Sequence, residues 1–379
     1  MQQNITIAVI GLGAMGLGIA QVFAKAGYQV IATDQFEAAR QTAKDRMIAG
    51  MQPLVDKGKM SELDVTSITE KVTILDDLNA FKPYKTTLVI EAIAEDLQIK
   101  QSVFKELELV TPDTCIFATN TSSLSVVEIA SGLINSNRLI GLHFFNPAPV
   151  MKLVEFITQE NQPEEIKDRI TSLMQPTGKT VIACKDLPGF IVNRCARPFY
   201  GEALAMLEEG IPAKKIDAQI MSMGFRLGPF GLIDLVGADI NLAATESLYT
   251  ASDKNPRYYV FDALRKNVSA GKLGRKSEAG FIYPDRVQAA PQKNHEIERR
   301  MIACLVNEAA WLSYESDLLS DDIDLALKLG LNFPFGPFEL ASTLGYERIA
   351  ETLENLETSA PSHLKGRYNI CPILSDLLA

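Results

Sequence analysis

Short apolar runs, rich in β-branched residues, recur through the first half of the chain and alternate there with helix-like segments. The runs have the length of strands that are buried on both faces of a sheet. They are residues 5–10, 28–33, 72–75, 87–93, 115–119, 138–145, 152–157 and 180–184. Helices are expected over residues 18–27, 36–70, 97–110 and 126–131. This alternation predicts an α/β fold with a doubly wound, mostly parallel sheet, in which ligands bind beyond the carboxyl ends of the strands.

Helix-type periodicity takes over after Lys185, and we place a domain boundary near residues 185–188. The helical half contains an internal repeat, which predicts an all-α part made of two repeated units. Its matching segments are Gly201-Glu-Ala, Ile216-Asp217 and Gly228-Pro-Phe in the first copy, and Asn307-Glu-Ala, Ile323-Asp324 and Gly336-Pro-Phe in the second. The predicted domains are 1–186 for the sheet, 187–285 for the first helical unit with a connecting segment, and 286–379 for the second unit.

The composition is that of an ordinary globular protein, with 47% hydrophobic and 22% charged residues among 379. A net charge of −10 argues against a nucleic-acid-binding or anionic-membrane surface, because both need an extended positive field. No apolar run reaches the ~18 residues of a membrane span, and the N-terminus lacks a basic and apolar leader, so a cytoplasmic protein is expected. The five scattered cysteines predict neither a disulfide framework nor a zinc site, and no metal is expected.

The loop after the first predicted strand reads Gly11-Leu-Gly13-Ala-Met15-Gly16. In this spacing Gly11 permits a tight turn, Gly13 lets the backbone approach a pyrophosphate, and Gly16 lets the helix pack on the strand. Such a motif is weak alone, since glycine-rich turns also arise for structural reasons. Asp34 ends the second predicted strand, where a carboxylate can bind a ribose 2′-hydroxyl and repel a 2′-phosphate. A solvated Asp is the plainer alternative, but the segment, Met15 included, indicates a Rossmann-type domain that binds NAD rather than NADP.

His143 is the histidine that lies in a strongly apolar, strand-like context, with Glu155 twelve residues later and Ser122 upstream. Histidine suits proton transfer near neutrality, and a carboxylate partner would fix its tautomer and stabilise the imidazolium. The pair can form only if the strand of Glu155 lies beside that of His143. On spacing alone, a satisfied core histidine and a charge at a strand edge are the slightly favoured interpretation.

Four sequence blocks resemble the signature blocks of the L-3-hydroxyacyl-CoA dehydrogenase family, which includes the 3-hydroxybutyryl-CoA dehydrogenases. They are Asn120-Thr-Ser-Ser-Leu124, Gly141-Leu-His-Phe-Phe-Asn-Pro147, Met151-Lys-Leu-Val-Glu155 and Asp186-Leu-Pro-Gly-Phe-Ile-Val-Asn-Arg194. Four blocks in order are highly specific. The resemblance implies an enzyme that uses NAD to oxidise a (3S)-3-hydroxyacyl-CoA reversibly to the 3-ketoacyl-CoA.

The same resemblance implies roles for individual residues. His143 would be the general base and Glu155 its partner, while Ser122 and Asn193 would hydrogen-bond around the substrate oxygens.

The cofactor side of the site is also implied by the resemblance. Glu95 and Lys100 match positions near the nicotinamide or its ribose, and Asn120 is assigned to the cofactor with them. Lys57 and Lys59 are most simply a solvated surface, but they would also suit the anionic nucleotide end of coenzyme A.

Two alternatives remain open. The loop Gly-Leu-Gly-Ala-Met-Gly is shared with β-hydroxyacid dehydrogenases that act on free acids, which use a catalytic lysine on the helix after the sheet. Here that helix carries Asn193 and Arg194 instead. The second alternative is a dinucleotide-binding protein without turnover.

The duplication of the helical unit bears on the oligomeric state. By family analogy, dehydrogenases with one copy pair these units between subunits. We expect the second copy to fill that interface within one chain, which predicts a monomer or a weak homodimer. Only the first copy is preceded by the segment that delivers Asn193, so the first copy can be catalytic and the second is expected to be structural.

Overall fold

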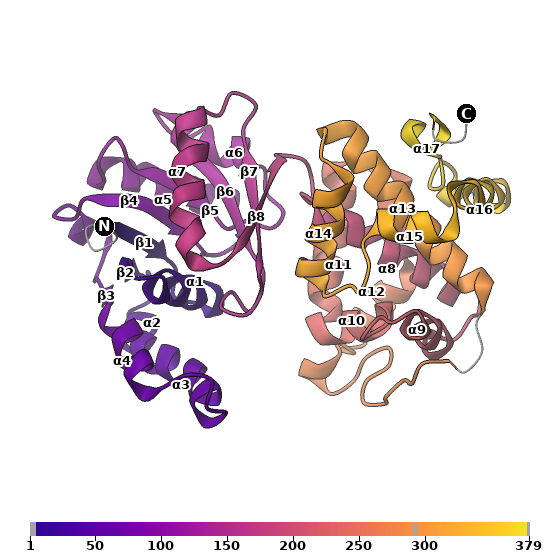
Figure 1. The fold of residues 1–379 in the computed structure, drawn as a ribbon, viewed down its shortest axis with the longest axis horizontal. Coiled ribbons are helices and arrows are strands. Elements are labelled where there is room, and N and C mark those ends of the chain that lie inside the picture. The colour runs from indigo at the N-terminus through magenta and orange to yellow at the C-terminus, as the bar shows by residue number, and fades with distance from the viewer. Residues whose placement is uncertain (1–4, 291–293, 377–379) are drawn as a thin grey trace. The chain divides into compact units, whose positions relative to one another are not determined.

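The computed structural model describes residues 5–290 and 294–376. The chain forms two compact units, Met1–Leu187 and Pro188–Ala379 (Figure 1). The helical unit contains both copies of the repeat.

The first unit is built on an eight-stranded sheet, counted over the described residues, in the order β3-β2-β1-β4-β5-β6-β7-β8. Neighbouring strands are parallel except β6 and β7, which are antiparallel. The prediction of a doubly wound, mostly parallel sheet is therefore confirmed. The strands are β1 (Thr6–Ile10), β2 (Gln29–Thr33), β3 (Val72–Ile74), β4 (Thr86–Glu91), β5 (Ile116–Thr119), β6 (Leu139–Phe144), β7 (Leu153–Thr158) and β8 (Thr180–Lys185).

The strand order reverses direction at β1, and this explains where the helices lie. The chain steps from β1 to β2 in one direction and from β4 to β5 in the other, and right-handed crossovers then place α1 and α5 on opposite faces. In agreement, α1 contacts α3 and α4, whereas α5 contacts α6. The helices are α1 (Ala14–Lys25), α2 (Glu37–Gln41), α3 (Ala43–Asp56), α4 (Glu62–Glu70), α5 (Leu97–Val110), α6 (Val126–Ala130) and α7 (Glu164–Met174).

The predicted helical stretch 36–70 is three helices, of which α3 and α4 project from the sheet as a pair (Figure 1). Gly58, at φ 64°, makes the turn between them. The helix start predicted at Ser61 is confirmed, because the Ser61 hydroxyl accepts from the Asp64 N–H while the Asp64 carboxylate accepts from the Ser61 N–H.

The glycine loop joins β1 to α1 under tight steric limits. Gly11 has φ 97° and donates its N–H to the Thr33 carbonyl at 2.8 Å. A Cβ on Gly16 would lie 1.9 Å from the Gly11 carbonyl oxygen, whereas a Cβ on Gly13 would meet no heavy atom within 4 Å. Gly11 and Gly16 are therefore required by the fold, whereas the fold makes no steric demand on a side chain at Gly13.

The second unit is built of helices over its described residues, and the longest connection between two of them runs from residue 270 to residue 294. Its two long helices, α8 and α13, pack directly against each other. The helices are α8 (Val192–Glu208), α9 (Ala213–Ser222), α10 (Pro229–Val236), α11 (Ala238–Ala251), α12 (Asp262–Ser269), α13 (His295–Ser316), α14 (Ser320–Leu331), α15 (Pro337–Leu344), α16 (Tyr346–Ser359) and α17 (Pro372–Asp376).

The repeat is visible in matching contacts. Asp217 of α9 accepts from the N–H groups of Phe230 and Gly231, at 3.0 and 2.8 Å, and thereby caps α10. Asp324 of α14 caps α15 in the same way, through two backbone N–H groups at 2.8 and 3.0 Å. Both helix N-termini thus obtain a carboxylate for their unsatisfied donors and their dipole.

Buried charges join the copies where α8 and α13 meet. Glu308 of α13, 1% exposed, accepts from Arg194 Nε at 2.7 Å and Tyr258 Oη at 2.6 Å, and its Oε2 lies 3.0 Å from Arg257 Nε. Glu315 Oε2 accepts from Arg194 at 2.7 Å. We call these five residues the first exchange cluster; its donors come from the first copy and its carboxylates from the second.

Donors of the second copy make the equivalent contacts to carboxylates of the first copy. Glu202 of α8, fully buried, accepts from Arg300 Nε at 2.7 Å and Tyr368 Oη at 3.0 Å, and its Oε2 lies 3.8 Å from Arg367 Nε. Glu209 accepts from both terminal nitrogens of Arg300, at 2.6 and 2.8 Å. These residues form the second exchange cluster, and the two clusters are related as the halves of a two-fold interface.

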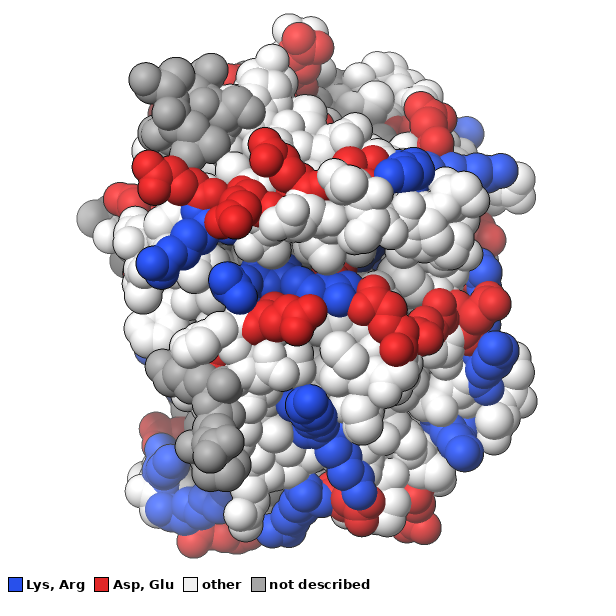
Figure 2. Space-filling view, turned by 90° about the vertical axis from the view of Figure 1, so that its right-hand side faces the viewer, with Lys and Arg blue, Asp and Glu red and all other residues white. Residues whose placement is uncertain are grey.

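One face of the molecule carries charged side chains of both signs. On the face shown in Figure 2, Lys and Arg side chains are interspersed with Asp and Glu. Among residues 5–290 and 294–376, no helix has the length and apolar character needed to cross a bilayer. The same residues include no group of three or more His, Cys, Asp or Glu placed to hold a metal ion.

The glycine loop generates a paired prediction on stability. Gly16→Ala should lower the free energy of unfolding by roughly 1–3 kcal/mol, because the new methyl group must displace backbone. Gly13→Ala, the matched control, should change it by no more than about 0.5 kcal/mol. Urea unfolding of both variants measures this, and equal losses of stability would contradict the assigned roles.

Candidate active site

His143 and Glu155 face each other across the antiparallel pair β6 and β7. The register of the two strands sets the residues directly opposite one another. His143 Nδ1 lies 2.6 Å from Glu155 Oε2, and the two side chains are 8% and 0% exposed. The pairing on which the predicted acid/base role depended is therefore present.

The tautomer of His143 follows from the chemistry of its partner. A carboxylate only accepts hydrogen bonds, so Nδ1 carries the hydrogen and donates it to Glu155. Nε2 is then the ring nitrogen that can take a proton. A negative charge beside the ring stabilises the imidazolium that proton uptake produces. The ring of Phe145 lies 4.6 Å from the imidazole, centroid to centroid, and limits its rotation.

Asn120 begins the loop that runs beside this pair. Thr119, the last residue of β5, pairs with Gly141, two positions before His143. The Asn120 side chain accepts from the Phe144 N–H at 2.8 Å, which ties the end of β5 to the end of β6. The structure thus places Asn120 next to His143 with a structural hydrogen bond, while its role toward the cofactor stays a prediction.

Glu95 accepts several hydrogen bonds from the loop after β5. Its Oε1 accepts from the Thr121 hydroxyl at 2.6 Å, from the N–H groups of Ser122 and Ser123, and from the Ser123 hydroxyl. Partial burial would raise the pKa of this carboxyl, but Lys100 and the hydrogen bonds outweigh burial and lower it. Glu95 is thus held ionised, and it brings the predicted residue Ser122, itself exposed, to the carboxyl edge of the sheet.

Lys100 is buried rather than open to a ligand, with 1% of its side chain exposed. Its ammonium lies 2.5 Å from Glu91 Oε1 and 3.2 Å from Glu95 Oε2. The Thr119 hydroxyl donates to the second oxygen of Glu91 at 2.7 Å. The ammonium therefore links the end of β4 to the Glu95 loop, and direct contact with the cofactor stays a prediction.

Two residues of this arrangement were missed from the sequence: Glu91, the buried partner of Lys100, and Thr121, the closest donor to Glu95. The available signal for Glu91 was a carboxylate at the end of an apolar strand with a lysine nine residues later. Such a group cannot stay buried and ionised without a partner.

The glycine loop and Asp34 lie together at the end of β1 and β2. Asp34 Oδ2 accepts from the Leu12 N–H at 2.7 Å, and Oδ1 accepts from the Phe36 N–H. Gly13, whose Cβ position is open, is the N-cap of α1. An open approach to a helix N-terminus beside a carboxylate fits the pyrophosphate and ribose of a dinucleotide, and Met15 lies half-buried in the first turn.

The remaining predicted residues belong to other elements of the chain. Lys57 and Lys59 are exposed on the turn between α3 and α4. Asn193 is half-buried in the first turn of α8, in the helical unit. Their roles toward a substrate stay predictions.

Comparison with known proteins bears on the whole chain. The family model described as "3-hydroxyacyl-CoA dehydrogenase, NAD binding domain" matches residues 6–187. The model described as "3-hydroxyacyl-CoA dehydrogenase, C-terminal domain" matches residues 189–283 and again 297–379, which confirms the duplicated helical unit.

Individual relatives agree with the family models. The 3-hydroxyadipyl-CoA dehydrogenase of Escherichia coli is 31% identical, with 97% of this chain and 96% of the relative covered. The probable 3-hydroxybutyryl-CoA dehydrogenase of Bacillus subtilis is 37% identical over 73% of this chain and 96% of its own length. The crystal structure of 3-hydroxybutyryl-CoA dehydrogenase from Escherichia coli is 30% identical, with a TM-score of 0.89 and coverage of 99% and 98%. With its NAD-binding domain and two copies of the C-terminal domain, the chain belongs to the 3-hydroxyacyl-CoA dehydrogenase family.

Proposed function

We propose that the protein oxidises a (3S)-3-hydroxyacyl-CoA reversibly to the 3-ketoacyl-CoA, with His143 as the general base. The observation that carries the proposal is the buried pair of His143 and Glu155 at 2.6 Å. NAD, when bound, supplies the acceptor for the hydride that leaves C3. His143 Nε2 takes the hydroxyl proton as the carbonyl forms, and Glu155 balances the resulting positive charge.

Substrate contacts complete the proposal. Ser122 and Asn193 hydrogen-bond to the substrate oxygens, as the family resemblance implies. Ser122 is suited to this by its exposure and by the Glu95 bond that holds its backbone. Lys57 and Lys59, both exposed, are proposed to contact the nucleotide end of coenzyme A.

The names of the relatives indicate two kinds of acyl group. Relatives of similar identity are named for 3-hydroxyadipyl-CoA and for 3-hydroxybutyryl-CoA, and the adipyl chain is two carbons longer and ends in a carboxylate. A panel of short, long and dicarboxylic 3-hydroxyacyl thioesters would rank them by kcat/KM.

We also propose that the protein is a monomer or a weak homodimer. The two copies of the helical unit exchange equivalent buried contacts within one chain, so the surfaces that would be shared between two subunits are occupied internally. The Bacillus relative, which matches only 73% of this chain, lacks the length for a second copy.

NADH consumption with acetoacetyl-CoA tests the proposed function. We expect turnover by the unmodified protein and a loss of ~10²–10⁴-fold in kcat for His143→Gln, because a positioned base contributes about that much. NADH affinity should survive in the variant, since the glycine loop and Asp34 are unchanged.

Other outcomes separate the alternatives. Turnover of free 3-hydroxy acids alone would support the β-hydroxyacid dehydrogenase, and NADH binding without turnover of any thioester would support a binding protein. Full activity of His143→Gln would overturn the assignment of the base.

Light scattering during size exclusion tests the oligomeric state. The expected mass is that of one chain, 41.6 kDa. A dimer that persists at sub-micromolar concentration would contradict the proposal.

A further inference from the structure

The first exchange cluster lies immediately beside Asn193. Arg194, the next residue along α8, is 3% exposed and is bound by Glu308 and Glu315, both from α13 of the second copy. Burial alone would lower the pKa of Arg194, but Glu308 and Glu315 hold it above its ordinary value. The first turn of the helix that carries Asn193 is therefore anchored to the second copy by a permanently charged group.

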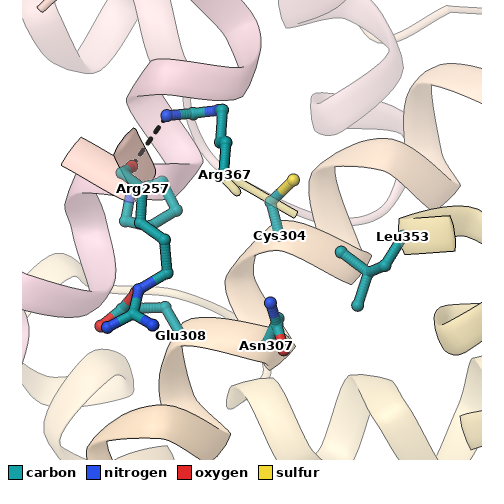
Figure 3. A pocket seen from close by; sticks show the side chains of 7 residues that line it. Arg257, Cys304, Asn307, Glu308, Leu353 and Arg367 are labelled. Atoms are coloured by element: carbon teal, nitrogen blue, oxygen red, sulfur yellow. Dashed lines mark hydrogen bonds and ion pairs between the residues drawn. The ribbon is translucent and has the colours of Figure 1, made fainter. Parts of the chain in front are cut away.

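Glu308 is itself held on several sides. Figure 3 shows Arg257 reaching to Glu308, and the Tyr258 hydroxyl donates to the same carboxylate oxygen as Arg194. The two arginines and two glutamates of the cluster balance in charge, so removal of one carboxylate leaves a buried guanidinium without its counter-charge. The network therefore holds the guanidinium of Arg194 in a fixed position.

The backbone before Asn193 needs this support. Gly189 and Phe190 lie in the left-handed region, at φ 77° and 49°, and Phe190 is a bulky residue for which that region is unfavourable. The Arg194 N–H donates to the Gly189 carbonyl at 3.0 Å, which closes the turn. Arg194 thus closes the turn through its backbone N–H, and the ion pairs of its side chain hold the same residue in place.

The second exchange cluster has the same chemistry as the first, but no residue equivalent to Asn193 precedes its arginine. Arg300 occupies in α13 the place of Arg194 in α8, since each lies eight residues before the buried glutamate of its own helix. Its carboxylates are Glu202 and Glu209. The residue before it is Arg299, which is exposed and bonds to the His295 carbonyl of its own helix.

We propose that Glu308, supported by Glu315, is a positioning residue for Asn193, so that the second copy takes part in catalysis without contacting substrate. The inference rests on the proposed function, in which Asn193 binds the substrate. It departs from the expectation that the second copy is only structural.

Two isosteric variants with the same chemical defect form the test. Glu308→Gln and Glu202→Gln each leave a buried arginine with reduced counter-charge, and both should lower the melting temperature similarly. Only Glu308→Gln should lower kcat with acetoacetyl-CoA, by roughly 10–100-fold, because small misplacements of a positioning group have effects of that size. NADH affinity should not change in either. Equal kcat in the two folded variants would overturn the proposal.

A double-mutant cycle tests whether the effect passes through Asn193. In an Asn193→Ala background, Glu308→Gln should have little further effect on kcat, whereas an effect as large as in the unmodified protein would contradict the proposal. If the buried substitutions prevent folding, Glu315→Gln and Glu209→Gln provide a milder matched pair at partly exposed positions, 37% and 52%.

A readout without substrate separates this inference from the proposed function. Amide hydrogen exchange over residues 190–195 should rise in Glu308→Gln and stay unchanged in Glu202→Gln. That result would support the positioning role even if no thioester were turned over, and absence of turnover by the unmodified protein would count against the proposed function alone. Unchanged exchange in Glu308→Gln would overturn the positioning role.

Discussion

The antiparallel pairing of β6 and β7 is the constraint on which the candidate site depends. Every other neighbouring pair in the described sheet is parallel, and the reversal at β7 sets His143 against Glu155 in direct register. Side chains alternate between the faces of a strand, so a slip of one residue would turn one partner to the opposite face. Because Glu155 is completely buried, its charge requires a fixed partner, and the same pairing that orients the histidine satisfies this requirement.

Around this pair, polar residues at the carboxyl ends of the strands hold the loops in place. The Asn120 amide ties β5 to β6, Lys100 forms ion pairs with both Glu91 and Glu95, and Glu95 accepts hydrogen bonds from the loop that contains Ser122. Lys100 and Glu91 are buried, so their ion pair is little screened by water, whereas the hydrogen bond that Glu95 accepts from the Ser122 N–H is exposed. The edge is thus preorganised before any ligand enters it.

The sequence predicted the sheet well because its strands are short apolar runs bounded by glycines and polar residues. It also predicted the glycine loop, whose steric demands at Gly11 and Gly16 are local. Pairing of His143 with Glu155 could only be stated as a condition, since strand order and direction arise from contacts far apart in the chain. For the same reason the contact of Thr121 with Glu95 was missed, whereas the pairing of Glu91 with Lys100, nine residues later, is local and could have been predicted.

The exchange clusters also could not be predicted from the sequence. The repeat was evident from matching segments, but the residues that bind across it lie 50 to 166 positions apart and belong to opposite copies. Nothing in the order of residues indicates that Arg194 meets α13 rather than a neighbour in its own copy. Burial of these charges makes each copy incomplete without the other, since a buried guanidinium needs its carboxylate.

We expect Glu155 to make His143 an effective base. The most direct test is kcat for Glu155→Gln with acetoacetyl-CoA and NADH, because the amide keeps the shape of the side chain and removes its charge. We expect a decrease of ~10²–10⁴-fold with NADH affinity retained, since both the tautomer and the charge stabilisation of the imidazole would be lost. A kcat equal to that of the unmodified protein would contradict it.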